Sequence, residues 1–442
     1  MNNFNTKDNA KLVFSATNIF ICEMIYLFTL MAGYADSFYY FMRGYIVFFL
    51  IYLVLFLVGG KLFDLFELGE TTTTDLFLSF ILTCLFSGAF VWLILCLFTI
   101  QIISVVPVLL MVLAQIVLGA FLLMFENRYI RAVYPPVRVV AIYGEEHHGL
   151  IGKLNNVKDL SISIIKTIPV DKLDYDKLDE FIGDADGVVT LDVHHENKKR
   201  IFKACYDKQL LVYDVPSITD MLLASSDILH MVDTPILKIN KFGPSQIERA
   251  VKRVIDVLGS LVLLVLTSPI MLGTAIAIKM EDGGDIFYKQ IRLTKDKKEF
   301  KIIKFRSMVM NAEKNTGVVL AKENDDRITK VGKFIRKTRF DELPQLINIL
   351  NGDMSFVGPR PERPEIYAEI TKEMPEFTYR LVVKAGLTGF AQIYGKYNTS
   401  LRDKLLLDLY YIENYSVIED IKLLLLTLKI IFNKESTEGI KE

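Results

Sequence analysis

The sharpest candidate for chemistry in this sequence is an acidic pair, Asp341-Glu342, followed by Leu343-Pro344. Apolar residues then repeat at helical spacing and a glycine ends the run: Leu343, Leu346, Ile347, Leu350 and Gly352. This pattern predicts a helix with Asp341 as its N-cap and Pro344 in its first turn. The positive end of a helix favours an ionised carboxylate and also attracts phosphate.

The chemistry that fits such a position is nucleophilic attack on phosphorus. An ionised Asp341 can form an acyl-phosphate, and Glu342 beside it can bind a metal ion or handle a proton. The alternative is a plain helix cap with an acidic first turn, because caps of this kind are common. The two residues alone do not decide between these interpretations.

Basic residues gather around the pair in the sequence: Lys304, Arg306, Arg327, Arg336 and Arg339. Such a cluster suits a polyanionic substrate such as a diphosphate. A basic surface attracted to anionic lipids is a second interpretation, and both can hold. Further on, Pro359-Arg360-Pro361 after Gly358 predicts a rigid loop that presents Arg360 to a phosphate or a planar base, because proline fixes its own backbone and restricts the residue before it.

The elements that must position these residues begin with four apolar runs, at about 12–32, 44–63, 76–98 and 102–124. Each is near the roughly 20 residues that a helix needs to cross a bilayer. Hydrophobic residues make up 52% of the chain and its mean hydropathy is +0.33, which is high for a soluble protein. Most flanking cations fall on one side of the four predicted spans, which the positive-inside rule assigns to the cytoplasm. The net charge of -1 gives no reason to expect a nucleic-acid partner.

Residues 137–240 are predicted to form a small α/β domain with parallel strands. Gly144 to Gly149 occupies the place of a Rossmann phosphate loop, but it lacks GxGxxG and carries two acidic residues. A structural or regulatory Rossmann-like module is therefore favoured over a dinucleotide site. The pairs His147/His148 and His194/His195 are expected at the surface. The cysteines (Cys22, Cys84, Cys96 and Cys205) have no paired spacing, so neither a disulfide framework nor a zinc site is expected.

A fifth apolar stretch, Val254 to Ile278, is long enough to span the membrane, but cations flank it on both sides. Positive charge at both ends argues that both ends stay on the cytoplasmic side. Pro269, after Ser268, should bend the helix near its middle. These observations favour a re-entrant helix over an ordinary kinked fifth span. Farther along, residues 401–432 are expected to form one or two amphipathic helices, either at the membrane interface or packed in a soluble core.

Several motifs, in this order, resemble the bacterial sugar transferase family, which comprises polyprenyl-phosphate hexose-1-phosphate transferases with a monotopic catalytic domain: KRVIDVLGSLVLLVLTSPI, FYKQIRL, FKIIKFRSM, DDRITKVGKFIRKTRFDELPQLINILNGDMSFVGPRP and GLTGFAQIYGKYN. The resemblance covers about residues 248–435. The four predicted spans and the degenerate nucleotide-binding-like module look like the long, multi-pass members.

The resemblance implies roles for residues at matching positions. It implies a re-entrant helix broken at Ser268-Pro269, and a catalytic pair in which Asp341 is the nucleophile and magnesium is required, with Asp341 and Glu342 as its ligands. It also implies an arginine one turn before the pair, Arg336, and a nucleotide-side loop at Pro359, Arg360 and Pro361. One departure is that Gly284-Asp285-Ile286 stands where many relatives have Gly-Pro before Phe-Tyr, which leaves the local turn open.

The expected protein is therefore a membrane protein with a four-helix transmembrane bundle (1–132), a Rossmann-like module (133–243) and a mainly α-helical catalytic domain (244–442) with a re-entrant helix at 250–280. Its expected activity is transfer of hexose-1-phosphate from a UDP-sugar to undecaprenyl phosphate with release of UMP, at the cytoplasmic face of the cell membrane. A homodimer is possible. Two alternatives are a glycosyltransferase that releases UDP and a membrane scaffold or sensor without enzyme activity.

Overall fold

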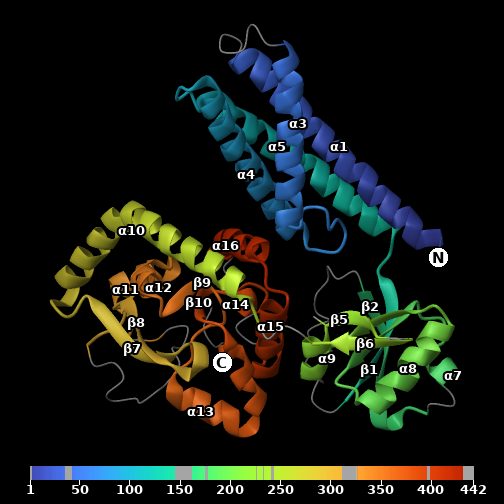
Figure 1. Cartoon of the computed structure of the whole chain (residues 1–442). Coiled ribbons are helices and arrows are strands. Elements are labelled where there is room, and N and C mark those ends of the chain that lie inside the picture. Colours follow the sequence, from blue (N-terminus) through green and yellow to red (C-terminus); the bar gives the residue numbers. More distant parts are fainter. Residues whose placement is uncertain are drawn as a thin grey trace. The chain divides into compact units, whose positions relative to one another are not determined.

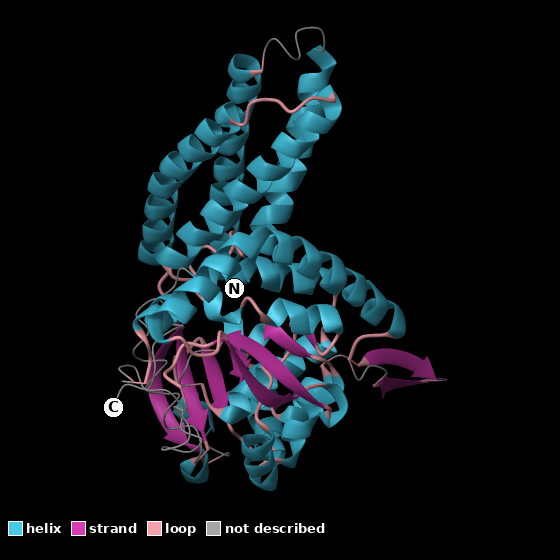
Figure 2. Cartoon of the chain, turned by 90° about the vertical axis from the view of Figure 1, so that its left-hand side faces the viewer, coloured by secondary structure: helices cyan, strands magenta, loops and turns pink. Residues whose placement is uncertain are grey.

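The computed structural model describes residues 2–34, 42–144, 162–174, 178–224, 226–231, 233–239, 243–310, 325, 327–395 and 399–431. The chain divides into two compact units, Met1–Val215 and Pro216–Glu442. Helices predominate over short strands (Figure 2). His147 and His148 lie outside the described residues. The expected division into three segments stays a prediction.

Four long helices open the first unit: α1 (Asn2–Gly33), α3 (Met42–Leu62), α4 (Thr73–Thr99) and α5 (Val106–Val133). Together with α10 (Gln246–Asp282) they are long and apolar enough to cross a membrane. Large apolar side chains on their outer faces, such as Phe28 and Phe121, are exposed, which suits lipid rather than water. These helices are those of a membrane protein, as the sequence predicts.

A four-stranded parallel sheet follows in the first unit, in the order β2-β1-β3-β4. Its strands are β1 (Val137–Tyr143), β2 (Ile162–Pro169), β3 (Gly187–Leu191) and β4 (Leu211–Asp214), with η2 (Val170–Lys172), α7 (Leu178–Ile182) and α8 (His195–Asp207) between them. At the carboxyl ends of β3 and β4, Thr190 donates to Asp214 at 2.5 Å and Lys198 forms an ion pair with Asp214 at 2.5 Å. His194 and His195 are exposed, as expected.

The second unit is mainly helical, with three two-stranded sheets. Its elements are α9 (Ile218–Leu223), β5 (Asp227–Met231), β6 (Thr234–Lys238), α10, β7 (Phe287–Leu293), η4 (Lys295–Lys297), β8 (Glu299–Phe305), α11 (Lys330–Lys337), η5 (Phe340–Glu342), α12 (Gln345–Asn351), β9 (Met354–Val357), α13 (Pro364–Glu373), η6 (Pro375–Val382), β10 (Ala385–Thr388), α14 (Phe390–Ile393), α15 (Leu401–Glu413) and α16 (Val417–Ile431). Strands β7 and β8 form a hairpin, and β9 pairs with β10 in parallel.

Helix α10 is one continuous element with Pro269 inside it, and it is visibly bent (Figure 1). Proline has no N–H to donate to the carbonyl four residues earlier, which here is that of Val265. The Ser268 hydroxyl donates to that carbonyl at 2.7 Å instead. The Thr267 hydroxyl donates to Leu263 O at 2.6 Å, a backbone contact that also bends helices. The sequence Thr-Ser-Pro therefore permits the bend without leaving the Val265 carbonyl unpaired.

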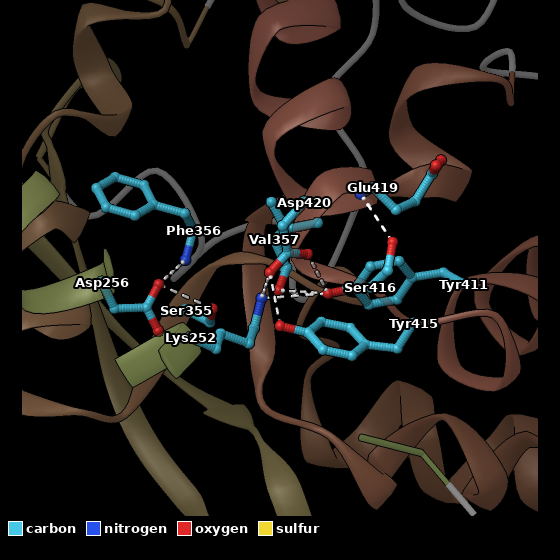
Figure 3. A network of polar contacts seen from close by, with 10 residues as sticks. All are labelled: Lys252, Asp256, Ser355, Phe356, Val357, Tyr411, Tyr415, Ser416, Glu419 and Asp420. Atoms are coloured by element: carbon cyan, nitrogen blue, oxygen red, sulfur yellow. Dashed lines mark hydrogen bonds and ion pairs between the residues drawn. The ribbon is translucent and has the colours of Figure 1, made fainter. Parts of the chain in front are cut away.

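Polar contacts attach the first part of α10 to the rest of its unit (Figure 3). Asp256 accepts hydrogen bonds from the Ser355 hydroxyl and the Phe356 backbone N–H at 3.0 Å each. Lys252 forms a 2.5 Å ion pair with Asp420, which also accepts a 2.7 Å hydrogen bond from Tyr411. An otherwise apolar helix thus has a defined orientation toward β9, α15 and α16.

Helices α15 and α16 pack into the core of the second unit. Leu405, Leu409 and Leu423 are almost fully buried, and Tyr411 and Ile412 join the cluster around β9 and α12. Of the two expectations for residues 401–432, the structure favours packed core helices, although α16 still exposes Ile418.

The Lys252–Asp420 pair yields a stability prediction. Lys252→Met should destabilise the protein by about 3–5 kcal/mol, because it leaves a buried carboxylate without its cation. The double variant Lys252→Met/Asp420→Asn should regain most of this loss. Unfolding of the purified protein in detergent, followed by intrinsic fluorescence, measures both. Equal destabilisation by the single and double variants would contradict the ion-pair interpretation.

Candidate active site

The acidic pair lies in the 3-10 turn η5, directly before α12. Arg339 adopts the left-handed conformation with φ 58°, and the chain is helical from Phe340 onward. Bonds of the 3-10 type, such as Leu343 N–H to Phe340 O at 3.2 Å, continue the turn into α12. The prediction that Asp341 is the N-cap was wrong. Arg339 caps the 3-10 turn η5 and Pro344 caps α12, so Asp341 lies inside a helical turn that the left-handed Arg339 starts earlier than the apolar pattern suggests.

Two anchors fix α12, and with it the pair. The Asn348 side chain accepts from Ile303 N–H at 3.0 Å and donates to Lys301 O at 2.8 Å, which ties α12 to β8. At the other end, Arg253 of α10 donates to the carbonyls of Ile349 and Leu350 at 2.7 Å each. A cation suits the negative end of a helix, so this contact also offsets the helix dipole.

Glu342 is surrounded by cations from three segments. Its Oε1 lies 3.1 Å from Lys304 Nζ of β8, and 3.9 Å from both Arg339 Nη1 and Arg360 Nη2. Burial alone would raise the pKa of Glu342, but Lys304, Arg360 and Arg339 outweigh it and lower this pKa to about 2. Glu342 is therefore a permanent negative charge at neutral pH.

Asp341 has the opposite environment. Its Oδ1 is buried and has no hydrogen-bond partner among the described residues. Burial and the neighbouring charge of Glu342 raise the pKa of Asp341 to about 6, although Lys304, Arg336 and Arg339 oppose the shift. The pair therefore consists of one carboxylate engaged by cations and one carboxylate with an uncommitted oxygen, which suits a nucleophile.

The Pro359-Arg360-Pro361 loop follows β9 and brings Arg360 to the pair. Gly358 N–H donates to Thr388 O, and Gly386 N–H donates to Pro359 O, both at 2.9 Å. The two backbones cross so closely that a Cβ on Gly386 would lie 2.1 Å from Gly358 N. Only glycine allows this crossing, which fixes the start of the loop and the position of Arg360.

The predicted cations separate into two groups. Lys304, Arg336, Arg339 and Arg360 act on the acidic pair electrostatically. Arg306 pairs with Asp282 at the end of α10, and Arg327 makes bonds of 2.8 and 2.6 Å to Asp325. Both guanidinium groups are thus engaged by aspartates other than Asp341. Their predicted role in substrate binding stays a prediction.

Arg292 of β7 is a site residue that the sequence reasoning missed. Its guanidinium donates to Pro361 O at 3.2 Å and to the amide oxygen of Gln290 at 2.7 Å, so it attaches the loop that carries Arg360 to strand β7. Burial lowers the pKa of Arg292, with Glu362 opposing this shift. The signal was the alternation along the strand, which places Gln290 and Arg292 on the face that also carries Lys304.

Magnesium has few protein ligands to choose from here. No group of three or more His, Cys, Asp or Glu side chains gathers in the described part of the chain. Mg²⁺ is nevertheless commonly bound through one or two carboxylates together with substrate phosphates. Asp341, with its uncommitted buried oxygen, and the adjacent Glu342 fit that mode.

Comparison with known proteins identifies the family. The bacterial sugar transferase family matches residues 247–434, from α10 through α16. A protein of Aeromonas hydrophila named UDP-N-acetylgalactosamine-undecaprenyl-phosphate N-acetylgalactosaminephosphotransferase is 37% identical over 53% of this chain and 55% of its own length. One of Escherichia coli (strain K12) named UDP-glucose:undecaprenyl-phosphate glucose-1-phosphate transferase is 35% identical over 52% and 50%. The matches thus span about half the length of these relatives.

A shorter relative is covered more fully. A protein of Bacillus subtilis (strain 168), provisionally named an undecaprenyl-phosphate N-acetylgalactosaminyl 1-phosphate transferase, is 48% identical over 132 residues, which are 30% of this chain and 73% of that protein. On this coverage, and on the family match over the whole segment that builds the acidic pair and its cations, this chain belongs to the bacterial sugar transferase family.

Proposed function

We propose that this protein transfers hexose-1-phosphate from a UDP-sugar to undecaprenyl phosphate and releases UMP. Such a reaction is the priming step of exopolysaccharide, capsule, O-antigen or other glycoconjugate synthesis. The observation that carries the proposal is the uncommitted Oδ1 of Asp341 beside a Glu342 that three cations hold ionised. The names of the relatives, which specify transfer of sugar phosphates to undecaprenyl phosphate, support the substrate class.

The reaction has two displacements at one phosphorus atom. Asp341 attacks the β-phosphorus of the UDP-sugar, an O–P bond forms, and the bond from phosphorus to the bridging oxygen breaks, so that its electron pair leaves with UMP. A phosphate oxygen of undecaprenyl phosphate then attacks the same phosphorus and releases the Asp341 carboxylate. The product is an undecaprenyl diphosphate sugar, and atoms and charges balance.

The cations around the pair have separate tasks in this reaction. Arg336, with a buried Nη1 that lacks a partner among the described residues, is suited to bind an oxygen of the transferring phosphoryl group. Arg360 is half exposed on its loop and is suited to the nucleotide side. Mg²⁺, held by Asp341 and Glu342, would offset the diphosphate charge.

We also infer that α10 is re-entrant and that the second unit faces the cytoplasm, where UDP-sugars are made. Gly352 and Asp353, which are adjacent in the sequence, contact the chain on both sides of the bend in α10. Before the bend, Arg253 lies against Gly352. After it, Thr294, which follows β7, donates to Asp353 O at 2.8 Å. A straight helix of 37 residues would be about 55 Å long and would hold these segments on opposite sides of a bilayer.

Asp341→Asn should abolish UMP release, since an amide cannot serve as the nucleophile. It should also stabilise the protein at neutral pH. The pKa of Asp341 is raised in the folded state from 3.8 to about 6, so its ionisation costs stability above that range and nothing below pH 4. Without metal, the variant should be more stable than wild type by about 3 kcal/mol at pH 7.5, and the gap should close toward pH 4.

A luminescence assay for UMP and unfolding curves in EDTA check both parts of this prediction. Release of UDP rather than UMP by the wild-type protein would overturn the proposed reaction. Substantial UMP release by Asp341→Asn would instead overturn only the covalent role of Asp341.

Arg336→Ala and Arg360→Ala should impair activity by different routes. Loss of Arg336 should lower kcat by roughly 10²-fold with a smaller change in KM, because its contact strengthens as charge develops on the phosphoryl oxygens. Loss of Arg360 should mainly raise KM for the UDP-sugar. Initial rates over a range of UDP-sugar concentrations separate the two. Arg200→Ala, on the exposed face of α8, is the control; wild-type kinetics for both site variants would contradict the assignment.

The topology of α10 can be tested by labelling. Cysteines at the exposed positions Gln246 and Lys298, in a protein without its four native cysteines, should both resist an impermeant maleimide in intact cells and react after permeabilisation. Pro269→Leu should favour a straight helix and lower activity. Labelling of the cysteine at 298 alone in intact cells would disprove the re-entrant arrangement.

A further inference from the structure

Gln345 is a buried residue whose amide nitrogen has no hydrogen-bond partner among the described residues. It opens α12 and is 3% exposed. A buried amide donor without a partner costs stability, and most native proteins avoid it. Such a group therefore calls for an explanation in terms of function or strain.

Asn348, one turn later on the same helix, provides an internal comparison. It is also a buried amide, at 2% exposure, and both of its polar atoms are bonded to the backbone of β8. Asn348 thus has a structural role that fully accounts for its amide. An amide can therefore be buried on this face of α12 and still form all its hydrogen bonds. The missing partner of Gln345 Nε2 is due to its position on the helix.

The position of Gln345 is set by its neighbours in the same row. Glu342 precedes it by three residues and contacts Lys304 of β8, and Asn348 follows it by three and contacts Ile303 and Lys301 of β8. Residues three apart lie on one face of a helical turn. Gln345 therefore lies on the same face, between the catalytic-pair contact and the anchor, and within one turn of Asp341.

Three buried atoms without a partner among the described residues belong to the pair or to residues close to it: the acceptor Asp341 Oδ1 and two donors, Arg336 Nη1 and Gln345 Nε2. Arg336 acts electrostatically on Asp341, and Gln345 follows Asp341 by one turn. Transfer of a phosphoryl group needs a nucleophilic oxygen that attacks phosphorus and hydrogen-bond donors that stabilise the charge on the phosphoryl oxygens. These three atoms supply one nucleophile and two donors. We propose that Gln345 is a further catalytic residue that donates to a non-bridging oxygen of the transferring phosphoryl group, in addition to Arg336. This inference rests on the proposed function.

The test replaces Gln345 by methionine, which keeps the length of the side chain and removes the donor. In the full-length protein in detergent, Gln345→Met should lower kcat for UMP release by roughly 10²-fold, the usual effect of losing one such donor, with KM changed less than threefold. Its unfolding temperature should be equal to or above that of wild type, because an unpaired buried donor is replaced by an apolar group. A structural role predicts the reverse, a lower unfolding temperature in parallel with lost activity.

Gln392→Met is the matched control. The Gln392 amide nitrogen donates to Leu387 O at 3.3 Å, and its Oε1 is buried without a partner among the described residues, so Gln392→Met also replaces an incompletely bonded buried amide. Because Gln392 lies away from the acidic pair in the sequence and in α14, the kcat of this variant should stay near the wild-type value. A kcat for Gln345→Met within threefold of wild type, or a reduced unfolding temperature with reduced kcat, would overturn the role of Gln345. The comparison requires that the wild-type protein releases UMP in the same assay. Release of UDP by wild type would instead mark failure of the proposed function.

Discussion

The ion pair between Lys304 and Glu342 is the interaction on which the site depends. Two adjacent carboxylates in a largely buried turn repel each other, and burial penalises both charges. Lys304, with Arg339 and Arg360, stabilises the charge on Glu342 and leaves Asp341 with an uncommitted oxygen. Lys304 lies on β8, Glu342 in η5 and Arg360 after β9. The cations therefore surround Glu342 only when these three segments are packed together.

The assembly depends in turn on α10, although most of that helix is apolar. In its first part, Arg253 donates to the last carbonyls of α12, and Asp256 accepts hydrogen bonds from β9. Its last residues, Glu281 and Asp282, contact the N-terminus of α11 and the Arg306 side chain. The same helix therefore has polar contacts to the catalytic segments on both sides of Pro269, and an apolar surface elsewhere that suits lipid. Membrane attachment and the geometry of the site are properties of one element.

Much of this organisation can be predicted from the sequence. The length of the apolar runs gives the candidate membrane helices, and Thr-Ser-Pro inside the fifth run gives the bend. The order of motifs gives the family, and Asp341, Glu342, Lys304, Arg336, Arg339 and Arg360 do gather at one place. The helix start was misjudged, since the apolar repeat carries no information about the left-handed turn at Arg339. Arg292 and Gln345 were missed because a strand arginine and a helix glutamine are ordinary in composition, and their distinction lies in what surrounds them.

The sequence alone therefore determined the features that depend on neighbours along the chain: helix length, the proline bend, the acidic pair and the rigid Pro-Arg-Pro loop. Only the tertiary structure decided which cations serve the pair. Lys304, Arg306 and Arg327 look alike in sequence, yet Asp282 and Asp325 engage Arg306 and Arg327, while Lys304 meets Glu342. The reason is physical: the effect of a charge falls with distance and grows with burial, and both are set by how distant segments pack.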